Sequence, residues 1–376
     1  MKAQWFGTAV GAIFLLAACS SSEAPAASPS AAAPSNSSWS DVQAAGKREG
    51  RIVISGQGAP DAETAFSAGF NKQFPDIQLE YQAMTSPEAT AKLMTERKGN
   101  LFGVDLFVHG TPDILTTLIP AGAIDPMQPY LIGPDIQDQS AWLGGKFNFA
   151  DDAGKYDLIF TGGVKVPLVY NPNLVQASAF TSYKDLLDPR WKGKMAMLDP
   201  RVAGSGQGMA TFWYQTPGLG KDYLKQLLTD QAVVFTKDDR QLTDWVGRGE
   251  YPIAVGSSDF TAFALKAKGV PVESLPAEAL KETSYLTAGF GSAAVMNRAP
   301  HPNATKLYLD WMLSKSGQED LVKVTSYPSR RLDASAAGLP EPVVPKQGVH
   351  YQDSASETTA KVKTEVVDYL KSILPN

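Results

Sequence analysis

The chain has 376 residues, of which 43% are hydrophobic and 19% are charged, and its formal net charge is −5. This is the composition of an ordinary globular protein, and the length allows two lobes that each have a core. The slight acidic excess excludes the strongly basic surface that nucleic acids attract, so we expect no nucleic-acid partner.

The N-terminus has the pattern of a secretion signal. Lys2 precedes an apolar run, FGTAVGAIFLLAAC, which is too short to span a bilayer and has the length of a signal-peptide core. Cys19 ends this run after small residues and is the only cysteine, so it cannot form an intrachain disulfide. Residues 1–18 are therefore predicted to be a signal peptide.

The next segment is predicted to be a tether, over residues 19–45. Between positions 20 and 40 nearly every residue is Ser, Ala or Pro. Such a segment cannot bury enough apolar area to offset the entropy lost on ordering. It would join an anchor near Cys19 to the folded part of the chain.

From Arg51 onward, predicted strands and helices alternate. A β-branched run at 51–56 is followed by a helix at 61–74, in which Phe66, Phe70 and Phe74 share one face. Further strands are expected at 77–84, 104–110, 164–172, 194–198, 232–236, 252–256 and 289–297, and further helices at 85–99, 111–122, from 206, and at 238–249, 257–269, 303–317 and 357–374. This alternation predicts an α/β fold with largely parallel strands.

A glycine-rich loop, GSGQG at 204–208, follows one strand and opens a helix. A helix N-terminus offers free N–H groups and partial positive charge to an anion, and ligands of open α/β sheets bind beyond the carboxyl ends of strands. Other helices also begin with Ser or Thr after strands, although helix capping alone explains any one of them. The candidate ligand-binding residues are Gln57, Ser86, Thr111, Arg201, Ser205, Gly206, Ser257 and Ser258.

Sequence signatures of catalysis are missing. The histidines His109, His301 and His350 do not have metal-ligand spacing, no GxSxG motif occurs, and GSGQG lacks the Lys-Ser/Thr pair of a phosphate-binding NTPase loop. We therefore expect no enzyme, no catalytic residue, no bound metal and no cofactor. The alternatives from other classes are an α/β enzyme that uses 204–208 as a phosphate cradle and a tethered adhesion or scaffold protein.

Three segments carry a family resemblance: VPLVYNPNLV at 166–175, SYKDLLDPRWKGKMAMLDPR at 182–201, and HPNATKLYLDWMLSKSGQEDLVKVTSYPSR at 301–330. They resemble bacterial extracellular solute-binding proteins of the type 2 periplasmic-binding-protein fold, especially the branch that includes ferric-iron binders. The resemblance covers residues 50–330.

The resemblance implies two α/β lobes joined by crossover hinge strands, which close on one solute and deliver it to an ABC permease. Lobe 1 would span 46–170 and lobe 2 would span 171–288, and residues 289–376 would return to lobe 1 and end in closing helices. By the same resemblance, Cys19 would carry lipid, including palmitate, and become the mature N-terminus. The protein would be a monomeric, membrane-anchored lipoprotein in the periplasm or an equivalent extracytoplasmic space.

The ligand that we predict differs from the ferric iron of this branch. That branch has an adjacent tyrosine pair where this chain reads SSDFTAFAL, and often a histidine where it reads SGQGAPD. Ferric iron prefers anionic oxygen ligands such as phenolate. We therefore expect a small oxyanion (an organic acid, a phosphonate or a phosphate ester), with Arg201 as its cation, and keep ferric iron as the alternative. The other interpretation of Arg201 is a surface partner of a nearby aspartate.

Overall fold

The computed structural model describes residues 38–58, 61–289 and 291–374. The predicted signal peptide and the proposed lipid site Cys19 lie outside these residues. Within the described part of the chain, no helix is both long and apolar enough to cross a membrane.

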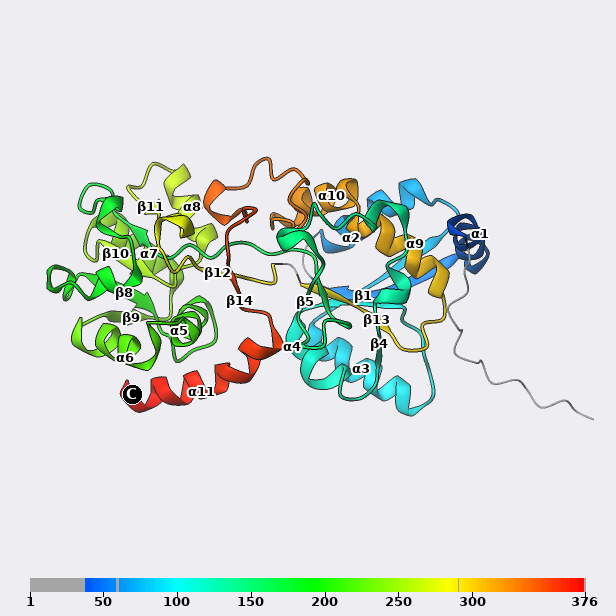
Figure 1. The fold of residues 1–376 in the computed structure, drawn as a ribbon, viewed down its shortest axis with the longest axis horizontal. Helices are drawn as coiled ribbons and strands as arrows, with labels where there is room; N and C mark the ends of the chain where they lie inside the picture. Colours follow the sequence, from blue (N-terminus) through cyan, green and yellow to red (C-terminus); the bar gives the residue numbers. More distant parts are fainter. Residues whose placement is uncertain (1–37, 59–60, 290, 375–376) are drawn as a thin grey trace, which may run out of the picture. The chain divides into compact units, whose positions relative to one another are not determined.

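The first of two large sheets has seven strands in the order β2-β1-β3-β13-β6-β5, with β4 paired to β13 (Figure 1). β1 is parallel to β2 and β3, whereas β13 is antiparallel to β3, β4 and β6. The strand bounds are β1 Arg51–Gln57, β2 Gln78–Met84, β3 Leu106–His109, β4 Ile124–Asp125, β5 Asn148–Phe149, β6 Leu158–Ile159 and β13 Ser292–Met296.

Helices cover both faces of this sheet, because successive side chains of a strand point to opposite faces. Ile52 and Ile54 of β1 pack in a core with α1, α2, α9 and α10, whereas Val53 packs in a second core with α3 and the turns after α4. The helix bounds are α1 Trp39–Glu49, α2 Ala62–Gln73, α3 Ser86–Lys98, α4 Thr111–Asp113, α9 Pro302–Leu313 and α10 Lys315–Thr325.

The second sheet has five strands in the order β11-β7-β10-β8-β9. Met195 and Met197 of β8 pack with α5, α6 and α11, and Ala196 packs with α7 and α8. The bounds are β7 Val169–Tyr170, β8 Met195–Leu198, β9 Val234–Thr236, β10 Ile253–Val255, β11 Glu273–Ser274, α5 Ser205–Gln215, α6 Gly220–Lys225, α7 Asp239–Arg248, α8 Asp259–Ala267 and α11 Glu357–Ile373.

Two crossover segments connect the sheets and run side by side. The Lys165 backbone N–H donates to the Tyr285 carbonyl oxygen at 2.9 Å, and Val164 forms a β-bridge with Leu286. A third stretch joins them, because β12 (Tyr285–Leu286) pairs in parallel with β14 (Gln352–Asp353). The predicted α/β fold with crossover strands is therefore confirmed. The expectation of largely parallel strands is wrong, because β13, β5 and β7 pair antiparallel with their neighbours.

Residues 349–374, here called the C-terminal strap, contact residues near the first sheet and the core of the second sheet. At the start of α11, Thr358 Oγ1 donates to Asp152 Oδ1 at 2.9 Å and the Lys361 ammonium pairs with Asp152 Oδ2 at 2.8 Å. Farther along, Val366 and Leu370 are buried in the core of the second sheet, where α11 lies along α5 (Figure 1, red). The chain end that we predicted to return to lobe 1 therefore also packs on the second sheet.

Most predicted elements occur in the structure, and four differ in extent. The helix predicted at 303–317 ends at Leu313, and a separate helix, α10, begins at Lys315, where the Ser314 side chain caps it. The strand predicted at 164–172 is reduced to β7, because Pro167 has no N–H to donate to a sheet and the preceding residues cross between sheets. The helix predicted at 111–122 becomes α4 followed by a π-helical turn, Ile114–Leu118. The predicted tether extends to residue 45, whereas α1 begins at Trp39, where Ser38 and Asp41 form a capping box.

A buried carboxyl on α9 predicts a pH-dependent stability. Asp310 is 3% exposed, and its Oδ1 accepts a 3.1 Å hydrogen bond from the Asp135 backbone N–H. Burial, assisted by the Asp135 carboxylate, raises the pKa of Asp310 to about 6. Because this value exceeds the unfolded pKa of about 3.9, the stabilisation is complete below pH 4 and is lost as the pH rises through 6.

We therefore expect Asp310→Asn, which keeps the acceptor oxygen and cannot ionise, to raise the free energy of unfolding by about 2 kcal/mol at pH 8 and by far less at pH 4. Urea titrations at both pH values measure the difference. The exposed Asp368 on α11 provides the control, since Asp368→Asn should show no such pH dependence. An equal change in Asp310→Asn at both pH values would contradict the assignment.

Candidate functional site

Among the predicted helix starts, the N-terminus of α5 has the features that best suit an anion. Its N-cap residue is Gly204, no side chain caps it, and its first turn contains no acidic residue. A Cβ on Gly206 would lie 2.1 Å from the Leu198 carbonyl oxygen, so only glycine lets the helix start this close to the end of β8. The first N–H groups of α5 lack partners within the helix and carry its partial positive charge.

The start of α8 lies beside the start of α5 and has the opposite character. A Cβ on Gly256 would lie 2.8 Å from Gly206 Cα, so the end of β10 touches the start of α5. The Ser258 backbone N–H already donates to Asp239 Oδ1 at 2.5 Å, and Asp259 opens the helix with a second carboxylate. The start of α5, unlike that of α8, has no carboxylate of its own.

A cavity of about 250 Å³, here called the hinge cavity, adjoins these two helix starts. Ser205, Ser258 and Asp259 line it from the second sheet's helices. The crossover segments and the stretch after α10 complete the wall with Gly163, Lys165, Tyr285, Thr287, Tyr327 and Pro328. The cavity therefore lies where the segments that connect the sheets meet the helix starts.

A buried ion pair forms one wall of the hinge cavity. The Lys165 side chain is 4% exposed, and its Nζ lies 2.8 Å from Asp259 Oδ1 and also donates to the Ser257 carbonyl oxygen. Burial raises the pKa of Asp259, and the nearby Lys165 ammonium opposes this rise. The pair ties the first crossover segment to the start of α8.

Two aromatic rings stand at this cavity on segments from different sheets. Phe260 of α8 is 49% exposed, and its ring meets that of Tyr327 edge to face with centroids 5.5 Å apart. Tyr327 belongs to the stretch after α10, which packs against the core of the first sheet. The ring pair is therefore a contact between the two halves of the molecule beside the hinge cavity.

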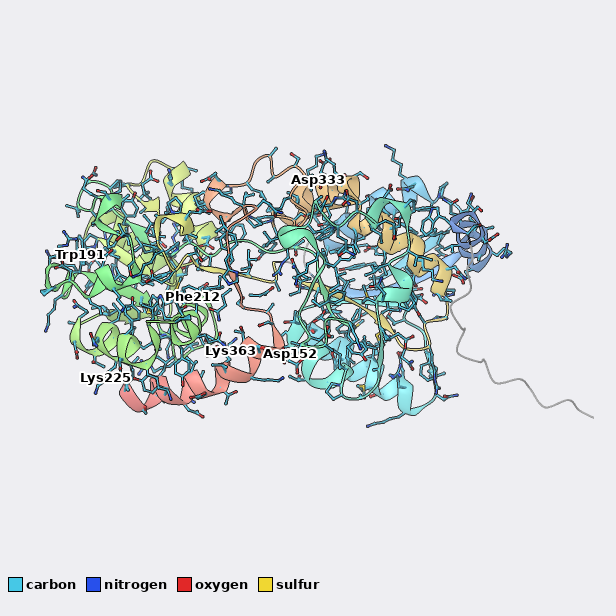
Figure 2. The ribbon with its side chains drawn as sticks, in the orientation of Figure 1. Asp152, Trp191, Phe212, Lys225, Asp333 and Lys363 are labelled. Atoms are coloured by element: carbon cyan, nitrogen blue, oxygen red, sulfur yellow. The ribbon has the colours of Figure 1, made fainter. Side chains whose placement is uncertain are left out.

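A second cavity, of about 330 Å³, extends from the start of α5 along that helix and beneath the C-terminal strap; we call it the strap cavity. It shares Ser205, Tyr285 and Thr287 with the hinge cavity. Figure 2 labels Phe212 on α5 and Lys363 on α11, which both line it. Tyr285 is buried, which raises its pKa and keeps its phenol protonated as a hydrogen-bond donor.

Of the predicted site residues, four from the second half of the chain lie together. Ser205 and Ser258 line the hinge cavity, the buried Ser257 offers its carbonyl to Lys165, and Gly206 forms the start of α5. These residues come from the ends of β8 and β10, as the carboxyl-end rule anticipates.

The predicted residues of the first half line neither cavity. Gln57 ends β1, and a Cβ on Gly291 would lie 3.1 Å from its Nε2. Ser86 begins α3, whose start already holds the Glu88 carboxylate, which accepts from the Thr85 N–H at 3.1 Å. Thr111 is buried at the start of α4, a helix of three residues.

Arg201 is engaged by its own neighbourhood. Its Nε donates to Asp199 Oδ1 at 2.9 Å and its Nη2 donates to Asp199 Oδ2 at 2.8 Å. Its Nη1 donates to the Leu374 carbonyl oxygen at 3.3 Å, at the end of the strap. Arg201 lines neither cavity, and its pairing matches the alternative interpretation, in which it is a partner of a nearby aspartate.

Several residues of the two cavities were not anticipated from the sequence. Lys165 gave a usable signal, because a lysine inside the apolar run VKVPLV must find a partner when the run is buried. Tyr285, Tyr327 and Lys363 gave no such signal, because they stand in a short strand, a loop and a helix that are far apart in the chain. Only the fold brings them to the start of α5.

The described residues contain no group of three or more His, Cys, Asp or Glu side chains arranged to hold a metal ion. The hinge cavity does contain two tyrosines, Tyr285 and Tyr327, with Asp259. Burial raises the pKa of both phenols. A protonated phenol is a poor ligand for ferric iron compared with phenolate.

Comparison with known proteins agrees with this architecture. An uncharacterized protein of Haemophilus influenzae is 34% identical over 142 residues, which are 36% of this chain and 38% of that protein, so the match spans well under half of the relative. The Trichodesmium protein IdiA (FutA), solved with iron and citrate, superposes with a TM-score of 0.63 at 16% identity, covering 86% of this chain and 99% of that one.

AfuA from Actinobacillus pleuropneumoniae, a periplasmic binding protein solved with fructose-6-phosphate, superposes with a TM-score of 0.52 at 21% identity, covering 85% of this chain and 98% of that one. At these identities the two structures establish the fold, which is the two-lobed fold of periplasmic binding proteins. The model of the family described as bacterial extracellular solute-binding protein matches residues 65–348. The chain therefore belongs to the family of bacterial extracellular solute-binding proteins.

Proposed function

We propose that this protein is the solute-binding component of an ABC-type uptake transporter. It captures a small oxyanionic solute between its two lobes and delivers it to a permease in the cytoplasmic membrane. The solute is an organic acid, a phosphonate or a phosphate ester. The protein performs no chemistry on it.

One observation carries the choice of an oxyanion: the uncapped start of α5 opens on both cavities. Gly204 provides no capping side chain and the first turn contains no acid, so the first N–H groups of α5 have no internal anion to satisfy them. The starts of α3 and α8, in contrast, already bind the carboxylates of Glu88 and Asp239. An oxyanion at α5 would gain several charge-assisted hydrogen bonds.

The solved relatives support both an organic anion and the iron alternative. AfuA was solved with fructose-6-phosphate, which is a phosphate ester, whereas the Trichodesmium protein was solved with iron and citrate. The chain lacks the adjacent tyrosine pair of the ferric branch. Because Asp199 pairs with Arg201, we place the oxyanion at the α5 start, with Ser205, Ser257 and Ser258. We therefore rank the oxyanion before ferric iron.

The location follows from the N-terminus. We propose that residues 1–18 are removed as a signal peptide, that Cys19 carries the lipid anchor, and that the mature protein works outside the cytoplasmic membrane. The apolar run before the single cysteine and the Ser/Ala/Pro-rich segment after it support this proposal.

A thermal-shift screen followed by titration calorimetry tests the function. Phosphate, phosphonates, sugar phosphates, organic acids and ferric citrate are added separately to the purified protein. A ligand at 100 times its dissociation constant stabilises the folded state by about 2.7 kcal/mol, which is readily seen. We expect an oxyanion to do so without being consumed. Stabilisation by ferric ion alone would favour the iron alternative, and turnover of a phosphate ester would favour the enzyme alternative.

A further inference from the structure

The strap cavity has the size of a small-molecule site and lies directly beside the α5 start. Its volume of about 330 Å³ falls in the range of known ligand pockets. We propose that it receives the hydroxyl-rich body of the oxyanionic solute, and that Lys363 is a specificity-determining contact to that body. This inference rests on the proposed function, because the anionic group of the same solute is placed at the start of α5.

The cavity is elongated, since one wall is a helix face. Ser205, Gly208, Phe212 and Gln215 line it from successive turns of α5. Ten residues of helix separate the first from the last, which is a distance of about 15 Å. An inorganic ion at Ser205 would leave most of this length empty, so the shape suits a solute with a chain or ring of several carbons.

The walls carry groups that suit hydroxyls. The Gln352 side-chain amide donates to Gln215 Oε1, and Thr359 Oγ1 lies 3.4 Å from the same oxygen. Each amide offers a donor and an acceptor, as a hydroxyl does. The aromatic rings of Phe212 and Tyr285 add apolar surface to the lining. Polar groups at fixed positions among aromatic rings are typical of sites that orient a small ligand.

Lys363 adds a cation without an internal partner. Lys363 is exposed and lines the cavity, and within the described part of the chain its ammonium makes no hydrogen bond or ion pair. The neighbouring charges of α11 are satisfied elsewhere: Lys361 pairs with Asp152 and Glu357, and Glu365 pairs with Lys221. Lys363 lies one turn beyond Thr359, on the same helix face. Its three N–H donors can therefore serve the oxygens of a solute.

The test compares a hydroxyl-rich anion with a bare one. Titration calorimetry measures the binding of glucose 6-phosphate, fructose 6-phosphate, gluconate and inorganic phosphate to the wild type and to Lys363→Ala. Lys371→Ala is the matched control, because Lys371 is exposed on the same helix and does not line the cavity. Gln215→Leu, which removes an amide from the opposite wall, is the second variant.

We expect at least one of the three hydroxyl-rich anions to bind the wild type more tightly than phosphate does. Lys363→Ala should weaken that binding about tenfold, Gln215→Leu should also weaken it, and Lys371→Ala should leave it unchanged. Phosphate affinity should change little in any variant. If phosphate binds but hydroxyls add no affinity, or if both cavity variants bind like the wild type, this inference is overturned and the proposed function stands. If no oxyanion binds the wild type, both are overturned.

Discussion

Ser205→Asp is expected to weaken binding of the oxyanionic solute by at least about 100-fold while leaving the protein as stable as the wild type. Ser205 is the first residue of α5 and lines both cavities. A carboxylate there would stand within about 4 Å of the bound anion, and two like charges at that distance repel by about 4 kcal/mol near a protein surface. The new carboxylate would also accept hydrogen bonds from the free N–H groups that the solute needs.

The same change should favour the helix itself. An acidic side chain in the first turn interacts well with the helix dipole, which contributes about 0.3–1 kcal/mol. Loss of binding in a protein that melts at the same or a higher temperature thus separates the ligand effect from unfolding. Few substitutions in a binding site offer this separation.

Ser205→Asn is the matched control, since it has nearly the same shape as Asp and no charge. Calorimetry with the cognate solute should show a change of less than about tenfold for Ser205→Asn and of at least about 100-fold for Ser205→Asp. Equal affinity in the two variants would show that the α5 start does not hold the anion. Tight ferric binding that survives in Ser205→Asp would support the iron alternative.

The fold was largely readable from the sequence because its helices and strands carry strong local patterns. Phe66 and Phe70 are fully buried at the spacing that predicted their helix. The strand around Pro167 was overestimated, because apolar character alone does not distinguish a strand from a buried crossover. The capping box at Ser38 was missed within a segment whose composition suggested a tether.

The candidate site could be predicted only in part, because its residues are spread from Gly163 to Lys363 along the chain. The loop GSGQG and the serines after β10 were predicted as candidates, since ligands of open α/β sheets bind beyond the carboxyl ends of strands. Arg201 illustrates the limit: a cation near a glycine-rich loop suits an anion, but Asp199 two residues earlier takes its guanidinium. Lys363, more than 150 residues beyond Ser205, reaches the same cavity only through the packing of α11.

Breaking the buried ion pair Lys165–Asp259 is expected to lower the stability of the protein strongly. Lys165→Met keeps the length of the side chain and removes the charge, which leaves the Asp259 carboxylate buried without its cation. Removing one partner of a buried pair costs about 3–5 kcal/mol, whereas replacing both by neutral groups is often nearly neutral. We therefore expect Lys165→Met to lower the free energy of unfolding by about 3 kcal/mol at pH 7, since Asp259 retains 14% exposure.

A double-mutant cycle with Asp259→Asn measures the coupling. The double variant should recover more than half of the loss caused by Lys165→Met, because no charge is then left buried. The loss of unfolding free energy in Lys165→Met should also shrink as the pH falls, since burial raises the pKa of Asp259 and protonation removes its charge.

Lys47→Met is the control: its partner Asp76 is 62% exposed, so the loss of unfolding free energy should stay below about 1 kcal/mol. Additive effects of the two substitutions would show that the pair does not hold α8 to the crossover segment. A strong coupling would mean that the α8 start and the first crossover strand behave as one unit beside the hinge cavity.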